Sequence, residues 1–263
     1  MTIFLIAGNT FRENVRDKVL YNLVLFALLL IICSLLLGQI SIGYEMKIIV
    51  DLGLTSISLV GVLIAVFIGI GLVYKEIDRR TIYNIVSKPV TRRQFLLGKL
   101  LGLLMTLGVN VAFMALGIFA ALVYLSSGWY WGYLNILPAI VLIFMELVLV
   151  TAIALFFSSF TTPVLSAVFT LCIWLAGHFN SDLVDLARIS QSPAMEYTCR
   201  VLYYLLPNFS NFKIAAGRLV IQQAGYMESP DAMAVLAAAS YGFLYAVILV
   251  VVAAGIFERR DFK

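Results

Sequence analysis

Few residues of this 263-residue sequence could do chemistry, because 63% of them are hydrophobic and only 12% are charged. Glu146 is the only carboxylate that we predict well inside an apolar run, and an ionisable group inside a membrane span is a functional candidate by default. It could line a substrate path or hold a proton, or it could lock helix packing or a dimer seam. Asn110 and Thr151 are further candidates for the pathway or seam, although they and Thr106 have a more ordinary role in bonding neighbouring helices. For His178, near the outer end of its span, we expect a structural role.

Several kinds of chemistry are disfavoured by the residues that remain. With one histidine, a Ser-His or Cys-His arrangement or a histidine-based metal site has few options. The cysteines Cys33, Cys172 and Cys199 are scattered without C-x-x-C spacing, which suggests neither a disulfide framework nor a metal site. Gly98-Lys99 lacks the upstream glycine and the following Ser or Thr of a phosphate-binding loop. We therefore expect no catalytic residue, no metal and no cofactor bound by this chain.

The composition is that of a membrane protein. Soluble domains carry roughly 25% charged residues, whereas this chain has half that share and a mean hydropathy of +1.04. A span needs about 20 apolar residues. We predict an all-α integral membrane protein, with residues 1–263 as a single transmembrane domain of six spans, the fifth of them short. The predicted spans are Leu20–Ile40, Leu54–Tyr74, Arg92–Tyr124, Ile136–Phe157, Pro163–His178 and Met233–Phe257.

The segments before and between the first spans have their own patterns. In residues 1–19, apolar side chains recur every four residues, which predicts an interfacial helix along the inner leaflet or, alternatively, a plain solvated helix start. Residues 41–53 are predicted to be a short polar loop. In the second span, small residues at four-residue spacing would let a neighbouring helix approach closely. The residues concerned are Ala7, Phe11, Val15 and Val19 in the first segment, Glu45, Lys47 and Asp51 in the loop, and Gly61, Ala65 and Gly69 in the span.

Two later segments are predicted to lie on the outer side. Residues 126–135 join the third and fourth spans and hold Trp129, Tyr130, Trp131 and Tyr133, as an aromatic belt at the membrane interface would. Residues 180–231 form the longest polar region. Their apolar stripes favour short amphipathic helices that dip into the outer leaflet or cap the bundle.

The distribution of Lys and Arg predicts the topology. Of the 18 basic residues, three precede the first span, seven lie between residues 75 and 99, and three follow the last span, which leaves five for the segments predicted outside. Positive charge favours the cytoplasmic side. Both termini and residues 75–94 are therefore predicted to be cytoplasmic, and the net charge of +4 requires no nucleic-acid partner.

Residues 75–94, which we call the elbow, separate the second and third spans. Between Arg79 and Lys88, Ile82 and Ile85 fall on one helical face and polar side chains on the other, as in a short amphipathic helix. Pro89 ends this pattern, because proline disfavours helical geometry in the residue before it. A capping box then opens the next helix. We predict a polar helical elbow shaped to be bound from the cytosol; the alternative is a solvated loop whose charges only fix topology.

The elbow resembles that of the ABC-2 type permease subunits of ATP-binding cassette (ABC) transporters, especially the branch associated with multi-copper enzyme maturation. In that family the loop contains an acidic residue, E-R-G-T, a short apolar helix, K-P-x-S/T-R and G-K. This chain departs at Arg80, where glycine is expected. The matching residues are Glu76, Asp78-Arg79-Arg80-Thr81, Lys88-Pro89-Val90-Thr91-Arg92 and Gly98-Lys99, with Phe156–Phe160, Leu206–Phe209 and Arg259–Phe262 as later resemblances.

The resemblance implies a half-transporter of type V exporter-like architecture in a bacterial inner membrane, surrounded by lipid. Two permease copies, identical or different, would pair, and a separate ATPase dimer would bind ATP and Mg and dock on the elbow as a coupling helix. An accessory or periplasmic protein is a further partner. The residues implied in ATPase coupling are Glu76, Asp78, Arg79, Arg80, Thr81, Ile82, Tyr83, Ile85, Lys88, Pro89, Arg92 and Arg93.

Other functions stay open from the residues alone. A membrane enzyme would need a cluster of catalytic groups at one depth, which a lone Glu does not provide. An ion-coupled secondary transporter or channel would show repeated halves and several buried charges. An ABC-type subunit could also transmit motion to a periplasmic partner without transport. The apolar spans favour a lipid-like, hydrophobic or peptide cargo, and no Met or Cys cluster supports copper handling.

Overall fold

The computed structural model describes residues 2–40, 45–78, 92–189, 193–212 and 232–259, and all the regular secondary structure within them is helical. This agrees with an all-α membrane protein. The described helices are α1 (Thr2–Val15), α2 (Lys18–Ile40), α3 (Glu45–Asp78), α5 (Arg92–Ser126), the 3₁₀ helix η1 (Trp131–Ile136), α6 (Leu137–Ser158), α7 (Pro163–His178), α8 (Asn180–Ile189), α9 (Pro193–Leu205) and α11 (Ala232–Arg259).

Five of these helices, α2, α3, α5, α6 and α11, are long and apolar enough to cross a membrane. They correspond to five of the six predicted spans. The remaining one, α7, begins at Pro163 as predicted, but its 16 residues extend about 24 Å at 1.5 Å per residue. A hydrocarbon core is about 30 Å thick, so α7 alone is shorter than a crossing.

The polar loop predicted for residues 41–53 is wrong over most of its length, because α3 already begins at Glu45. A glutamate in the first turn is favourable beside the positive end of the helix dipole. Lys47 and Asp51 lie one turn apart, where opposite charges support a helix. The helix therefore absorbs the charges that had suggested a loop and reaches 34 residues, about 51 Å.

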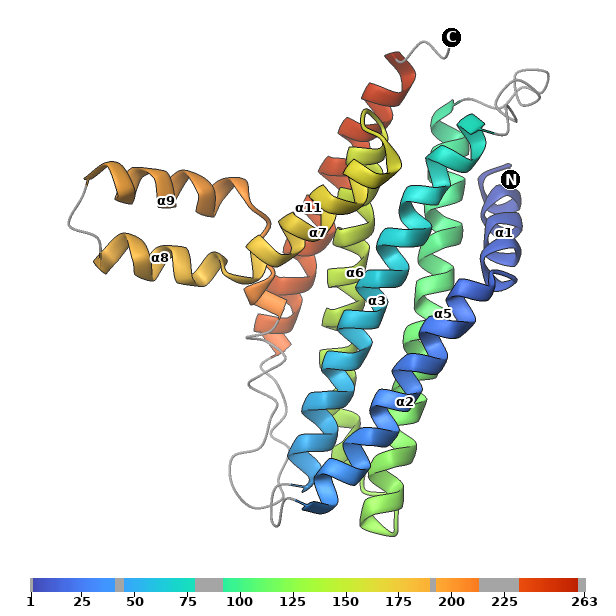
Figure 1. Cartoon of the computed structure of the whole chain (residues 1–263), viewed down its shortest axis with the longest axis vertical. Helices are drawn as coiled ribbons and strands as arrows, with labels where there is room; N and C mark the ends of the chain where they lie inside the picture. The colour runs from blue at the N-terminus through green and yellow to red at the C-terminus, as the bar shows by residue number, and fades with distance from the viewer. Residues whose placement is uncertain (1, 41–44, 79–91, 190–192, 213–231, 260–263) are drawn as a thin grey trace.

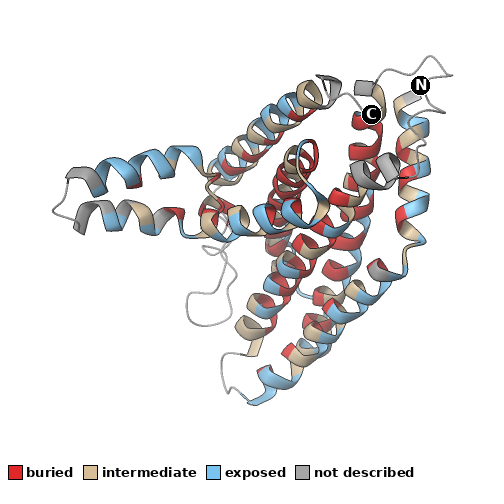
Figure 2. Ribbon diagram, turned by 45° about the horizontal axis from the view of Figure 1, so that its top comes forward, coloured by how far each residue is buried: buried red, intermediate tan, exposed pale blue. Residues whose placement is uncertain are grey.

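The helices α3 and α6 form the centre of the bundle. Two thirds (67%) of the spanning windows of both helices are buried, compared with 22% in α2 and 17% in α11. Figure 2 shows the buried residues concentrated in these central helices. Because α6 contacts α3, α5, α7 and α11, it positions most of the other spans.

The orientation of α1 differs from the expected interfacial helix. Instead of lying across the ends of the spans, α1 runs beside the first half of α5 (Figure 1). A Cβ built on Gly102 of α5 would lie 2.6 Å from the Ala7 carbonyl oxygen, so the two backbones almost touch. Of the predicted apolar row, Ala7 is buried and Phe11 and Val15 are half-buried, while Thr10 and Asn14 complete the buried face, because a close approach favours small side chains.

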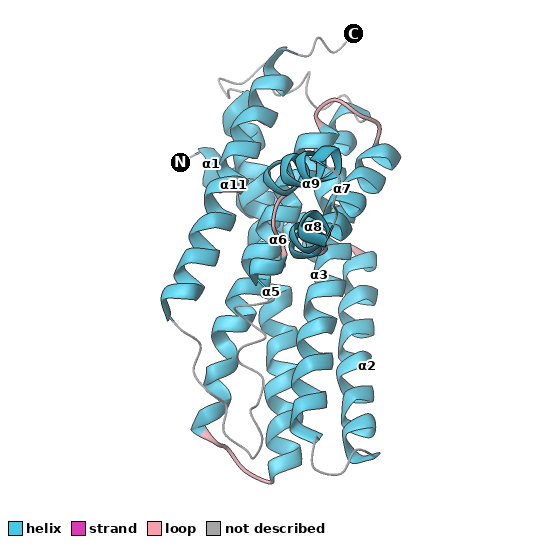
Figure 3. Ribbon diagram, turned by 90° about the vertical axis from the view of Figure 1, so that its left-hand side faces the viewer, coloured by secondary structure: helices cyan, strands magenta, loops and turns pink. Residues whose placement is uncertain are grey.

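The predicted helices after the fifth span exist as α8 and α9, which contact each other as an antiparallel pair. Figure 1 shows this pair projecting sideways partway along the bundle instead of capping its outer end, and in Figure 3 the pair points toward the viewer. Residues 213–231 lie outside the described part of the chain. In the other predicted outer segment, Trp129, Tyr130 and Trp131 are exposed as expected of an aromatic belt, whereas Tyr133 is buried.

Candidate functional site

Glu146 lies near the middle of α6 and is almost completely buried, with 4% of its side chain exposed. Trp174 of α7 donates its indole N–H to Glu146 Oε1 at 2.7 Å. Ser58 of α3 donates from its hydroxyl, which lies 3.3 Å from both carboxylate oxygens. The carboxylate therefore joins three helices that are far apart in the sequence.

His178, at the last residue of α7, completes this cluster. Its Nε2 lies 3.6 Å from Glu146 Oε1, and its Nδ1 lies 2.9 Å from the carbonyl oxygen of Trp174. A carbonyl oxygen only accepts hydrogen bonds, so Nδ1 carries a proton and Nε2 is the nitrogen that gains or loses one. The arrangement can hold one proton between Nε2 and the carboxylate, or an ion pair at the same place.

His178 ends its helix as expected, but it lies at the level of Glu146 and not near the outer end of the bundle. The helices α6 and α7 form an antiparallel pair joined by a tight turn at Ser159–Thr162. Counting from that turn, Glu146 lies twelve residues before the end of α6, and Trp174 and His178 lie eleven and fifteen residues after the start of α7. These offsets correspond to about 18, 17 and 22 Å along the helices, so all three reach the same level.

The same cluster anchors the segment after α9. Phe209 stacks on the His178 ring, with centroids 5.6 Å apart and planes at 12°. Its backbone N–H donates to the carbonyl oxygen of Gly177 at 3.1 Å. A Cβ on Gly177 would overlap Phe209 and the carbonyl of Pro207, so only glycine admits this contact. The end of α7 and the Leu206–Phe209 stretch therefore form one packed unit.

This unit also contacts α11. The hydroxyl of Tyr241 accepts a hydrogen bond from the backbone N–H of Asn208 at 3.0 Å, and Tyr245 donates to the carbonyl of Leu205 at 3.1 Å. Asn180, at the start of α8, donates to the carbonyl of Tyr203 at 3.3 Å. The start of α8 and the end of α9 are thus both attached to the bundle close to the place where Glu146 and His178 meet.

The structure separates the other intramembrane candidates from Glu146. Thr151 donates its hydroxyl to the carbonyl oxygen of Leu147 in its own helix at 2.7 Å, and not to the neighbouring helix that was expected. Thr106 does bond a neighbour, because Asn14 of α1 donates to its hydroxyl at 3.4 Å. Asn110 is buried, and its Nδ2 has no hydrogen-bond partner among the described residues.

Two members of the cluster, Trp174 and Ser58, are not among the residues singled out from the sequence. Glu146 and Trp174 lie at equal sequence distances on either side of the α6–α7 turn. Ala154 and Ser166 do so as well, and the Ser166 hydroxyl donates to the Ala154 carbonyl oxygen at 3.1 Å. Ser58 lies three residues before Gly61, on the face of α3 that packs against α6. The helical hairpin gave a sequence signal for Trp174, whereas Ser58 could be found only once α3 was known to pack against α6.

A family model described as ABC-2 family transporter protein matches residues 4–262. The chain belongs to the ABC-2 family of transporter proteins. The family is that of membrane subunits of ABC transporters, which work with an ABC ATPase subunit and typically are not catalytic themselves. Together with the five span-length helices, this makes the chain a multi-pass membrane protein. No curated protein matches it.

The residues implied in ATPase coupling fall at the margin of what is described for this ABC-2 protein. Glu76 and Asp78 belong to the last turns of α3, and Arg92 and Arg93 open α5. The rest, which are Arg79, Arg80, Thr81, Ile82, Tyr83, Ile85, Lys88 and Pro89, lie outside the described residues. The close helix approach predicted at Gly61, Ala65 and Gly69 is confirmed, because these residues face α6 or are buried.

The described part of this ABC-2 protein offers no evident place for a metal. Within it, no group of three or more His, Cys, Asp or Glu side chains is arranged to hold an ion. The cysteines Cys33, Cys172 and Cys199 are all free thiols. What the Glu146 cluster can do chemically is bind a proton or an ion pair and hold α3, α6 and α7 at a fixed separation.

Proposed function

We propose that this chain is the permease subunit of an ABC exporter in a bacterial inner membrane. Two permease copies pair, and a separate ATPase dimer hydrolyses Mg-bound ATP and docks on the elbow of each copy. The family match over residues 4–262 carries this proposal. The finer assignment, to the branch associated with multi-copper enzyme maturation, stays a prediction.

The elbow sequence supports docking of an ATPase. Five basic side chains between residues 79 and 93 could pair with acidic groups, while Ile82 and Ile85 could fill an apolar groove as anchors. Charge complementarity of this kind raises the association rate and fixes the register of the two surfaces.

Six membrane crossings with both termini cytoplasmic are supported by the directions of the helices. Figure 1 shows the start of α1 and the end of α11 at the same end of the bundle. The helices α6 and α11 run in the same direction, so the chain must return between them, and α7 is the element that begins this return.

The Glu146 cluster suggests how motion would travel through the subunit. It ties α7 to α3 and α6, while Phe209 and Tyr241 tie the end of α7 to α11. We infer that a displacement of α3, which leads directly into the elbow, moves α7 and the α8–α9 pair together. Transmission of motion to a periplasmic partner is the second candidate function; the pair itself projects from the bundle at the level of the Glu146 cluster and not at its outer end.

The test is co-purification of the full chain in detergent with the ABC ATPase encoded beside it, followed by measurement of ATPase activity. One variant changes Arg79, Arg80 and Ile82 to alanine. Its matched control changes Leu5 and Arg12 of α1, and Arg16 of the turn after it, to alanine, because these three side chains are exposed and the same charge and one aliphatic side chain are removed.

We expect the elbow variant to lose at least about tenfold in ATPase affinity, corresponding to about 1.4 kcal/mol, and the control to retain the complex. Stimulation of the ATPase by the wild-type chain should disappear in parallel. If no ATPase binds the wild-type chain, or if both variants behave alike, the permease assignment of the elbow is wrong. ATP-driven activity without cargo movement in proteoliposomes would favour the second candidate.

A further inference from the structure

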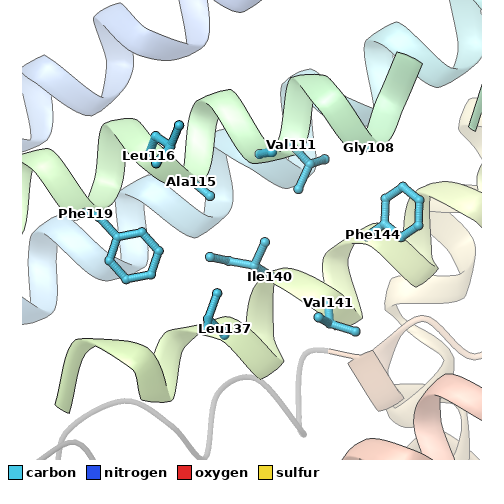
Figure 4. Close-up of a pocket in the computed structure, with 10 residues that line it drawn as sticks. Gly108, Val111, Ala115, Leu116, Phe119, Leu137, Ile140, Val141 and Phe144 are labelled. Carbon is cyan, nitrogen blue, oxygen red and sulfur yellow. The ribbon is translucent and has the colours of Figure 1, made fainter. Parts of the chain in front are cut away.

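An apolar cavity of about 480 Å³ lies between α5 and α6, on the side of α6 away from α3 (Figure 4). Its floor consists of Val111, Ala115 and Ile140, which are buried. Its rims are Leu116 and Val141, which are 63% and 47% exposed. The cavity is therefore an open groove along the helices rather than a closed internal void.

The groove exists because α5 presents small residues where it faces α6. Gly108, Ala112 and Ala115 recur at helical spacing along this face. A Cβ on Gly108 would meet only the Phe144 ring, at 3.6 Å, which is an ordinary van der Waals contact. The Phe144 ring of α6 lies at the Gly108 end, and the cavity extends beyond it along Ala112 and Ala115.

The chemistry of the groove selects an apolar occupant. All ten residues that line it are apolar or glycine, and all belong to two helices of spanning length. Water in such a site would lack hydrogen-bond partners, since a buried water needs two to four of them. In a membrane the groove opens onto lipid, and one end points to the aromatic belt, where Phe119 contacts Trp129 with ring centroids 6.2 Å apart.

The dimensions of the groove separate the possible apolar occupants. From Gly108 to Phe119 it follows eleven residues of α5, about 17 Å at 1.5 Å per residue. Its volume of about 480 Å³ then gives a mean cross-section of about 28 Å², roughly 6 Å across. A helix with side chains is about 10–12 Å wide, so it could rest on the exposed rims but could not lie within the groove. A single hydrocarbon chain, whose carbons keep about 4 Å from their neighbours, does fit.

We propose that the groove between α5 and α6 binds one acyl chain of a bilayer phospholipid, with its headgroup at the Trp129–Trp131 belt. The chain would lie on Val111, Ala115 and Ile140 and run toward Phe144, which closes the inner end (Figure 4). This site is distinct from the Glu146 cluster, which lies on the opposite flank of α6, and it does not depend on any ATPase partner.

The experiment measures lipid retained by the purified chain. The full chain is purified from nanodiscs of phosphatidylethanolamine and phosphatidylglycerol into mild detergent, and native mass spectrometry counts the phospholipids that remain bound. A second measurement uses a phosphatidylglycerol with a diazirine in one acyl chain and maps the labelled peptides. Ala112→Phe fills the groove, and Ala120→Phe is the matched control, because Ala120 is exposed and does not line the groove.

We expect one phospholipid per chain to be retained by the wild-type chain and by Ala120→Phe. The label should fall on residues 108–119 and 137–144, and Ala112→Phe should lower that yield about tenfold. Equal yields for the two variants, or wild-type labelling that rises in proportion to the probe without saturating, would show only bulk lipid contact and overturn the proposal.

The experiment also gives an answer if a variant fails to fold or if the groove belongs to a dimer interface. If Ala112→Phe does not fold, Ala112→Leu fills less of the groove and should lower the yield by a smaller factor. If neither variant folds, competition of unlabelled phosphatidylglycerol against the probe on the wild-type chain still decides, since a specific site saturates. A loss of dimer mass in Ala112→Phe with unchanged lipid labelling would assign the groove to a second copy and contradict the proposal.

Discussion

The two flanks of α6 show opposite solutions to the same packing problem. Toward α3, a Cβ built on Gly61 would lie 2.6 Å from Leu147 Cδ1, so the leucine already occupies the space that the glycine leaves. Toward α5, a Cβ built on Gly108 would meet the Phe144 ring only at an ordinary 3.6 Å, and the space beside Gly108 and Ala112 stays open as the groove. One flank is a tight interface and the other is a groove, although both present rows of small residues.

The two flanks also differ in polarity: the tight flank holds a buried polar cluster, and the groove is apolar. Glu146 faces the tight side, where Ser58, Trp174 and His178 surround it. The groove side is lined only by apolar residues and glycine. A buried carboxylate needs hydrogen-bond partners at fixed positions, which only closely packed helices provide. The comparison teaches that small residues permit close approach, and that polar contacts decide which neighbour approaches.

The largest effect is expected from removing the polar centre of the tight side. Glu146→Ala leaves Trp174 N–H and His178 without their acceptor in a buried place, which should cost about 3 kcal/mol of unfolding free energy. Glu146→Gln keeps an acceptor for Trp174 and should lose clearly less. Detergent-titration unfolding of the purified chain measures both. Equal stability of wild type and Glu146→Ala would mean that the cluster does not hold α7 in place.

A smaller effect is expected from one identical substitution made on each flank. Gly61→Ala forces Leu147 out of its position and should cost about 2 kcal/mol, which is typical of overpacking. Gly108→Ala meets only ordinary contact and should be neutral or slightly stabilising, because alanine is the better helix former. Melting temperatures of both variants check this difference. Similar melting temperatures would contradict the contrast between the two flanks.

The smallest effect is expected from a single hydrogen bond within the cluster. Trp174→Phe removes the indole donor to Glu146 Oε1 but keeps most of the ring, which should cost about 1 kcal/mol in a membrane setting. In the Glu146→Ala background the same change should cost almost nothing. A double-mutant cycle on unfolding free energies gives the coupling, and a coupling near zero would mean that the 2.7 Å contact contributes no stability.

Much of the helical architecture was predictable, because long apolar runs leave the backbone few alternatives. Pro163 opens α7 as expected, and the spans end within a few residues of their predicted limits, apart from α3. The start of α3 was missed because Glu45, Lys47 and Asp51 look like loop residues until their spacing along a helix is considered. The position of His178 was missed because α7 was assumed to reach the outer interface.

The amino-acid sequence alone determined the family, the number of long apolar segments and the small residues that allow close packing. These follow from composition and from local spacing, which do not depend on neighbours. Only the tertiary structure decided that α1 lies along α5, that Glu146 meets His178, and that one row of small residues is filled while the other is open. Such contacts depend on which helices become neighbours and at what register, and a residue's own sequence neighbourhood does not contain that information.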